Sequence, residues 1–144
     1  MPVKPNVDVI DEEVTFEDEM LEARGLITRT DGRGIITYTS KAYRQMTKYS
    51  KEELLGKPHS IVRHPDMPAA AFKQMWDTIK QDMAWEGYVK NLRKDGRYYW
   101  VVVRIEPFFD EDGKKIGYVG LRREPDRNII KQIEKQYKEM LKDE

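Results

Sequence analysis

The chain has 144 residues, of which 36% are charged, and its 26 lysines and arginines balance its 26 aspartates and glutamates. This length fits one domain of ordinary size, and a net charge of zero argues against a general nucleic-acid binder, which would carry a basic excess. The absence of cysteine excludes disulfides, thiol nucleophiles and cysteine-ligated metals.

The N-terminal part of the chain has weak signals for secondary structure, and a clear β-hairpin signal follows them. Residues 1–12 carry two prolines and little periodicity, and we expect them to be flexible. A short helix is predicted next, with Thr15 as its N-cap and Gly25 as its stop. Two β-rich runs, LITRTD and GIITYT, lie on either side of DGRG, in which Asp31-Gly32 is typical of a hairpin turn.

Helical signals dominate the next part of the chain. SKAYRQMTKY predicts a short helix, and SKEELLG predicts another with Ser50 and Glu53 spaced as a capping box. KPHSIVRHPD is too short and too polar for more than one helical turn. In PAAAFKQMWDTIKQ, apolar residues at i, i+3, i+4 and i+7 predict a buried helical stripe, formed by Phe72, Met75, Trp76 and Ile79.

From Trp85 onward the pattern is that of strands. WEGYVKNLR, RYYWVVVRIEPFF and KIGYVGLRRE predict three strands separated by the turn sequences KDG and DEDG. The last stretch, PDRNIIKQIEKQYKEMLKDE, predicts a helix with one apolar and one charged face. Because about 15 residues is marginal for an isolated helix in water, this helix must pack on its own domain, on a second copy or on a partner.

The order of elements indicates the fold class. Both groups of strands are connected by hairpins, which predicts an α+β domain with an antiparallel sheet and helices on one side. We assign residues 13–124 to this domain and residues 125–144 to a C-terminal amphipathic helix that contacts a dimer mate or partner.

The sequence SIVRHPDMPAAAF, residues 60–72, places unusual polar chemistry before an apolar helix. Arg63 has the geometry to pair with a phosphate or with Asp66. Pro68 suits the first turn of the helix, whose free backbone N–H groups favour an anion. Alternatively Asp66 caps that helix, Arg63 is its surface partner and His64 is a loop residue.

The order of elements resembles that of PAS sensor domains from about Glu13 to Glu124. Two motifs narrow the resemblance, VRHPDMPAAAF followed by MW, and W-x-G-x-V-K-N-x-R-K-D-G-x-Y-Y-W-V. Together they resemble the PAS domains of aerotaxis receptors, which bind FAD and report cellular redox state. The resemblance implies a five-stranded antiparallel sheet in the order 2-1-5-4-3, with the helices and the cofactor on one face.

The resemblance also implies cofactor-binding residues. The Arg-His-Pro-Asp segment carries over to Arg63, His64 and Asp66, with Trp85 and Asn91 as further pocket candidates. Asparagine is disfavoured inside a strand, and an inward Asn91 amide would exchange hydrogen bonds with the polar edge of a flavin. The alternative for Trp85 is ordinary core packing.

Three positions depart from related domains. Flavin-binding light-sensing LOV domains place a photoreactive cysteine where this chain has His59, so a cysteinyl-flavin adduct is excluded. Ser40 stands where many PAS domains have asparagine, and its shorter side chain makes it a weaker site candidate. Asp82 replaces a turn glycine, and we expect it to adopt the left-handed conformation there.

Alternative functions follow from the same fold, which hosts many ligands. FMN could replace FAD, or haem b could bind with His64 or His59 as axial ligand. A cofactor-free dimerisation or docking module is the third alternative. We expect no enzymatic activity, because the sequence has no nucleophile–base pair, no metal-ligand spacing and no Gly-rich nucleotide loop.

Partners and location are expectations of the same kind. No apolar run approaches the roughly 20 residues that span a bilayer, and we expect a cytoplasmic protein that does not insert into the membrane. The aerotaxis resemblance implies a membrane-bound chemoreceptor-type transducer as partner, which would recruit the protein to the inner face of the membrane. A homodimer and a stand-alone role in a split energy-taxis system are further expectations.

Overall fold

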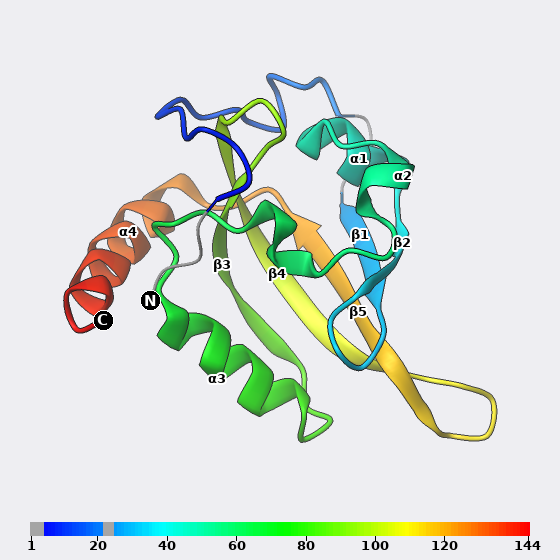
Figure 1. The fold of residues 1–144 in the computed structure, drawn as a ribbon. Coiled ribbons are helices and arrows are strands. Elements are labelled where there is room, and N and C mark those ends of the chain that lie inside the picture. Colours follow the sequence, from blue (N-terminus) through cyan, green and yellow to red (C-terminus); the bar gives the residue numbers. More distant parts are fainter. Residues whose placement is uncertain (1–4, 22–24) are drawn as a thin grey trace.

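The structure, a computed structural model, describes residues 5–21 and 25–144. It contains five strands, three α-helices and one 3-10 helix in the domain, and a C-terminal α-helix (Figure 1). The strands are β1 (Leu26–Thr30), β2 (Ile36–Thr39), β3 (Trp85–Leu92), β4 (Tyr98–Phe109) and β5 (Lys115–Arg123). The helices are α1 (Lys41–Thr47), α2 (Lys51–Leu54), η1 (His59–Val62), α3 (Ala69–Ile79) and α4 (Arg127–Lys142).

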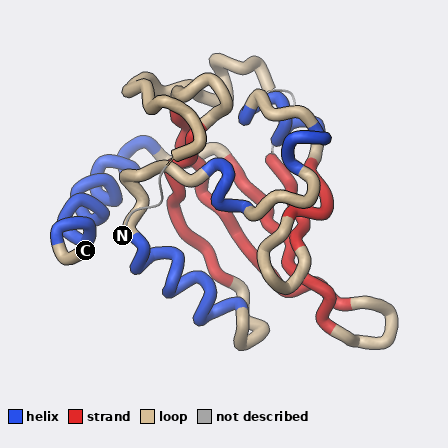
Figure 2. The backbone as a smooth tube through the Cα atoms, viewed as in Figure 1, coloured by secondary structure: helices blue, strands red, loops and turns tan. Residues whose placement is uncertain are grey.

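The strands form one antiparallel sheet in the order β2-β1-β5-β4-β3, which confirms the predicted fold class and strand order. The first hairpin and the last three strands are therefore joined through the β1–β5 pair. The helical segments from α1 to α3 lie on one face of the sheet, and Figure 2 shows the short helix η1 in front of the strands and α3 beside them, at the lower left.

Three aspartates explain why the strands turn where the sequence predicts. Asp31 Oδ1 accepts hydrogen bonds from the backbone N–H groups of Arg33 and Ile35, at 2.8 and 3.0 Å. Asp110 caps the β4–β5 turn in the same way, and Asp95 accepts from the N–H of Arg97 in the β3–β4 turn. These local side-chain bonds satisfy turn amides that have no partner in the sheet.

Helix starts and turns elsewhere also agree with local sequence signals. Ser50 and Glu53 form the predicted capping box at α2. KPHSIVRHPD contains one helical turn, η1, as expected. Asp82 has a φ of 61°, the left-handed conformation anticipated for it.

The N-terminal segment differs from the prediction. Thr15 and Asp18 exchange hydrogen bonds as at a helix start, but residues 16–20 form turns, and the left-handed φ of 51° at Met20 ends any helical run. The remainder of the predicted helix, residues 22–24, lies outside the described residues. Phe16 is buried against the domain, so packing decides the local conformation.

Residues 5–12 have no regular secondary structure, although part of this segment is held in place. The N–H of Ile10 donates to the carbonyl of Gly96 at 2.9 Å, and the N–H of Tyr98 donates to the carbonyl of Glu12 at 3.0 Å. The segment expected to be free therefore contacts the β3–β4 hairpin, whereas residues 1–4 lie outside the described part of the chain.

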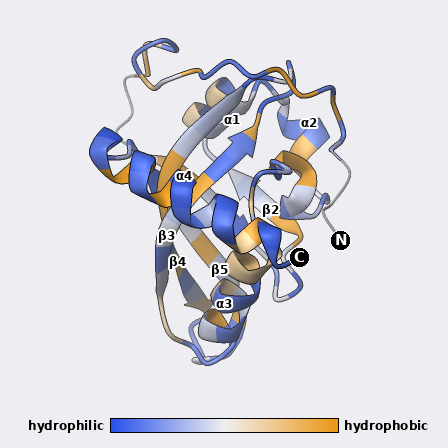
Figure 3. Cartoon of the chain, turned by 90° about the vertical axis from the view of Figure 1, so that its left-hand side faces the viewer, coloured by the Kyte–Doolittle hydropathy of each residue, from blue (hydrophilic) through white to orange (hydrophobic). Residues whose placement is uncertain are grey.

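Helix α4 packs on the face of the sheet opposite the other helices. Trp100 alternates along β4 with the inward residues Val101 and Val103, so it points outward, and its ring stacks on Tyr137 with a centroid distance of 6.4 Å. Tyr137 also donates a hydrogen bond to the carbonyl of Tyr88 on β3, at 2.7 Å. Figure 3 shows α4 lying across the strands with mainly hydrophilic residues outward.

Candidate functional site

A cavity of about 300 Å³ lies between the inner face of the sheet and the segment that contains η1 and α3. Its walls come from all of β1, β3, β4 and β5, because inward side chains recur at every second strand residue. The apolar part of the wall is formed by Val62, Phe72, Met75, Trp76, Ile79, Val89, Val103, Ile105 and Tyr118. The predicted stripe of α3 therefore faces a cavity, and of its four residues only Ile79 is fully buried.

Arg122 is the strongest polar feature of the cavity, and the sequence analysis did not identify it. Its side chain is buried on β5, with only 5% of the residue exposed. The guanidinium donates to Thr28 Oγ1 at 2.9 Å and to the carbonyl of Gly120 at 3.3 Å. It also lies 5.1 Å above the ring of Tyr43.

Arg122 differs from the other buried cations of the described chain. Arg93 pairs with Asp95 and Glu19, and Lys90 pairs with Asp66. Arg122 forms no ion pair with any carboxylate in residues 5–21 or 25–144. A buried charge without an opposite charge is costly, so the hydrogen bonds to Thr28, Gly120 and His59 are its only polar compensation within the described chain.

His59 shares the hydrogen-bond network of Arg122. Its Nε2 lies 3.0 Å from both Arg122 Nη2 and Thr28 Oγ1. Because a guanidinium only donates, Nε2 must be the accepting, unprotonated nitrogen. Burial, together with the positive charge of Arg122, lowers the pKa of His59 to about 3. The imidazole is therefore neutral at physiological pH.

Asn91 lies on the inner face of β3 and lines the cavity, as predicted. The residue is 6% exposed, and its Nδ2 donates to the hydroxyl of Tyr99 at 3.4 Å. Arg122, His59 and Asn91 thus give the apolar cavity a charged donor, a neutral imidazole and an amide. Such a wall, apolar with a few convergent polar groups, is typical of small-molecule sites.

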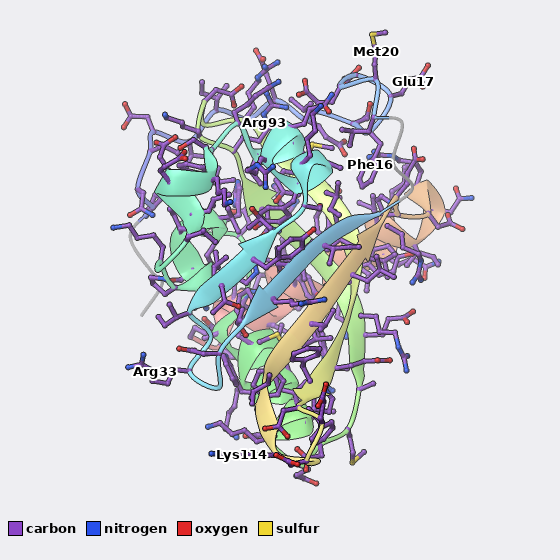
Figure 4. All side chains as sticks on the ribbon, turned by 90° about the vertical axis from the view of Figure 1, so that its right-hand side faces the viewer. Phe16, Glu17, Met20, Arg33, Arg93 and Lys114 are labelled. Atoms are coloured by element: carbon purple, nitrogen blue, oxygen red, sulfur yellow. The ribbon has the colours of Figure 1, made fainter. Side chains whose placement is uncertain are left out.

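Arg63 is the one residue of the Arg-His-Pro-Asp segment that reaches the cavity wall. Its guanidinium lies 4.2 Å above the ring of Phe72, which also lines the cavity. Burial lowers the pKa of Arg63, although the group remains a cation. Arg33 lines the same cavity at the β1–β2 hairpin, and Figure 4 shows its side chain projecting away from the sheet.

His64 and Asp66 lie outside the cavity wall. His64 is buried, and its Nδ1 accepts a hydrogen bond from the N–H of Asp66 at 2.9 Å. Asp66 Oδ2 accepts from Lys90 Nζ at 2.9 Å. Asp66 does not cap α3, whose N-cap is Pro68 without a side-chain bond, and Phe72 is the first α3 residue at the cavity.

Ser40 and Trp85 also lie outside the cavity wall. Ser40 is the N-cap of α1, and its Oγ accepts from the N–H groups of Tyr43 and Ile27, at 3.3 and 3.1 Å. Trp85 is buried and folds over Gly87, so that a Cβ on Gly87 would lie 2.4 Å from the indole. Both positions therefore have structural explanations.

Comparisons with known proteins identify the family of this chain. Residues 36–122 match the family described as the PAS fold. The chain belongs to the PAS family. An aerotaxis receptor from Escherichia coli (strain K12) is 42% identical over 113 residues, which is 78% of this chain and 22% of the receptor. The predicted resemblance to aerotaxis-receptor PAS domains is confirmed.

A second curated protein and a solved structure are also similar to this chain. A bacterioopsin transcriptional activator from Halobacterium salinarum is 30% identical over 74% of this chain and 16% of its own length. The light-state structure of the blue-light photoreceptor Aureochrome1 LOV superposes with a TM-score of 0.67 at 21% identity, covering 84% of this chain and 96% of the other. This PAS domain spans only 22% and 16% of the length of these two curated relatives.

The described residues contain neither a candidate membrane-spanning helix nor a candidate metal-binding cluster. Within residues 5–21 and 25–144, none of the helices has the length and apolar character that a membrane span requires. The same residues contain no cluster of three or more histidine, aspartate or glutamate side chains that would hold a metal ion.

Proposed function

We propose that the PAS domain binds FAD with the isoalloxazine ring in the cavity and reports the redox state of the flavin. The observation that carries the proposal is Arg122, a buried cation without a carboxylate partner in the described chain, beside Asn91 and apolar walls. A reducible flavin supplies a site that gains negative charge when it takes up electrons. Arg122 would oppose that charge at low local dielectric, where the attraction is strong.

The size of the cavity implies that only one part of the cofactor would lie inside it. A volume of about 300 Å³ is at the lower end of the range for ligand pockets, so a ring system fits and a whole dinucleotide does not. The phosphates would therefore lie outside, where Arg63 and Arg33 provide cations at the wall. Arginine pairs with phosphate in bidentate geometry, which favours a phosphorylated flavin.

Sensing would follow from the hydrogen-bond network around Arg122. If its guanidinium turns toward a more negative ligand, Thr28 and His59 lose their donor, and the β1–β5 pair on which these groups lie is affected. The partner that detects this change would be a chemoreceptor-type transducer, as the similarity to an aerotaxis receptor suggests. The proposed function requires no substrate turnover by any residue, as expected of a signalling module.

Haem is less well supported by the same geometry. Of the two histidines, only His59 lines the cavity, and its Nε2 lone pair is directed at the guanidinium of Arg122. An axial ligand needs that lone pair, and a cation beside the metal opposes binding. A Soret band that disappears in His59→Ala would nevertheless reverse this preference.

The decisive test combines spectroscopy with one matched pair of variants. The purified protein should show flavin absorption bands, and mass spectrometry of the released ligand should identify FAD. Arg122→Met should weaken FAD binding by about tenfold or more, as for loss of a charge-assisted bond. Arg123→Met, which removes the neighbouring exposed arginine, should change the affinity by less than about twofold.

Stability measurements distinguish loss of a ligand contact from damage to the fold. Arg122→Met removes a buried charge but also the hydrogen bonds to Thr28, Gly120 and His59, so the ligand-free variant should remain folded, with a free energy of unfolding within about 2 kcal/mol of the wild-type value. Protein that stays colourless after refolding with excess FAD contradicts the proposal and favours the cofactor-free alternative. Equal effects of Arg122→Met and Arg123→Met would remove the role given to Arg122.

A further inference from the structure

Residues 63–67 run along the free edge of β3 and are attached to it at several points. Arg63 forms an antiparallel bridge with Asn91, and the N–H of Lys90 donates to Met67 Sδ at 3.3 Å. The segment therefore lies beside Asn91 and Lys90. Asn91 faces the cavity, whereas Lys90 faces Asp66. Its position determines where Arg63 meets the cavity.

Lys90 is the strongest of these attachments. Only 8% of its side chain is exposed, its Nζ lies 2.9 Å from Asp66 Oδ2, and the ammonium lies 4.2 Å from the ring centre of Tyr98. A buried lysine requires a partner for its charge. Asp66 does not have this need, because 58% of its side chain is exposed to water. The buried lysine is thus the fixed member and the aspartate is the member that it holds.

Asp66 transmits this constraint to the backbone around Arg63. Its N–H is bonded to His64 Nδ1, and the N–H of Met67 donates to the carbonyl of His64 at 3.1 Å. These bonds close a compact turn directly after Arg63. With Asp66 tied to β3, the arginine side chain is held above Phe72 at the cavity wall.

We infer that Lys90 is a positioning residue for cofactor binding and that it acts through Asp66, which does not contact the cofactor. The inference rests on the proposed binding of a flavin. It gives different roles to the residues of the polar cluster before α3. Arg63 meets the phosphates, whereas His64, Asp66 and Lys90 fix its backbone. The inference also explains why the buried side chain beside Asn91 on β3 is a lysine.

A double-mutant cycle tests this assignment with FAD and riboflavin as probes. Lys90→Met and Asp66→Asn should each weaken FAD binding about tenfold, and the double variant should be no weaker than either single variant because the residues act as one unit. Riboflavin, which lacks phosphate, should lose less than about twofold. Lys90→Arg, which keeps the charge, should retain most of the FAD affinity.

Controls separate positioning from general damage. Lys94→Met breaks the exposed pair of Lys94 with Glu53 and should leave both affinities unchanged. Losses that multiply in the double variant, or an Asp66→Asn loss without a Lys90→Met loss, would show that Asp66 touches the ligand directly and overturn the inference. Equal losses for FAD and riboflavin would do the same.

Amide hydrogen exchange of the ligand-free protein gives a readout that does not depend on a cofactor. Residues 63–67 should exchange faster in Lys90→Met than in wild-type protein, and Lys94→Met should leave them unchanged. Wild-type protein that binds neither probe would contradict the proposed function, and the exchange data would still decide whether Lys90 holds the segment. Unchanged exchange in Lys90→Met would show that it does not.

Discussion

His59 and His64 are five residues apart and occupy different surroundings, yet both are held neutral. The pKa of His59 is lowered to about 3 by burial and by Arg122, and that of His64 is lowered to about 4 by burial and by Lys90. Each histidine also has a ring nitrogen that accepts a hydrogen bond, from Arg122 in one case and from the Asp66 N–H in the other. Protonation would break both bonds.

The pH dependence of stability should report these histidines. Both pKa values lie below the ordinary value of about 6.5. Between the folded value and the ordinary value, the unfolded chain is protonated at these histidines and the folded protein is not. Their contribution is therefore fully present above about pH 6.5 and is lost as the pH falls toward 4. Urea unfolding at pH 7 and pH 5 should show a loss of about 2 kcal/mol for each histidine.

A variant assigns the effect to its source. His59→Gln should remove about half of the loss between pH 7 and pH 5, because glutamine keeps an acceptor and does not titrate. Asp95 does not titrate in this range. Burial alone would raise the pKa of Asp95, but the hydrogen bonds of Arg93 and Arg97 outweigh it and lower the value to about 2. Equal stability at the two pH values would contradict the neutral state described for the histidines.

Single residues also show where sequence reasoning stops. Asn91 was predictable because an asparagine inside a strand is unusual and strand alternation gives its direction. The same alternation through Tyr118, Gly120 and Arg122 would have placed Arg122 inward, but an arginine near a strand end is usually a surface residue. The ion pair of Asp66 was not predictable, because its partner, Lys90, is 24 residues away and no local pattern connects the two.

At the scale of elements, local signals predicted most of the fold. Strands, Asp-Gly turns and the capping box of α2 depend on neighbours in sequence, and these predictions were confirmed. The helix predicted from Thr15 failed in residues 16–20 because tertiary contacts compete there. Glu19 pairs with Lys48 and approaches Arg93, the buried arginine labelled in Figure 4, and these contacts hold the segment in turns.

The amphipathic pattern of helix α4 predicts an apolar face but does not show which surface that face contacts. Its apolar stripe was compatible with a dimer, a transducer or its own domain, and the structure shows the last, with Ile130 and Tyr137 buried. A homodimer or transducer contact remains a prediction. It would have to use the outer side of α4 or another surface, such as the exposed Ile27, Tyr38 and Leu121 on the outer face of the sheet.

The attachment of α4 can be tested with a hydroxyl group. Tyr137→Phe removes the hydrogen bond to the Tyr88 carbonyl and should lower the free energy of unfolding by about 1 kcal/mol. Tyr38→Phe is the matched control, because Tyr38 is 45% exposed and its hydroxyl makes no hydrogen bond within the described chain. It should change the stability by less than about 0.5 kcal/mol in urea unfolding. Equal effects of the two variants would show that the bond does not anchor α4.

At the scale of the whole molecule, the sheet separates two functions. Its inner face encloses the cavity, and its outer face carries α4 on the strands β3 and β4. Strand β3 is shared, since Asn91 faces the cavity while Tyr88 binds α4. A ligand bound in the cavity as proposed would contact the strand that holds the C-terminal helix, which is the arrangement a sensor needs if its output leaves through that helix.

Ligand binding should stabilise the whole domain by mass action. With FAD at 100 times its dissociation constant, the free energy of unfolding should rise by about 2.7 kcal/mol. For a chain of this length the melting temperature should increase by roughly 8 °C, measured by circular dichroism. At the same FAD concentration a tenfold weaker affinity in Arg122→Met should reduce the stabilisation to about 1.4 kcal/mol, which is about half of the wild-type increase in melting temperature. ADP, which lacks the ring, should leave the melting temperature near its ligand-free value because it cannot fill the cavity. An equal increase with ADP would place the binding energy outside the cavity and refute the role given to its walls.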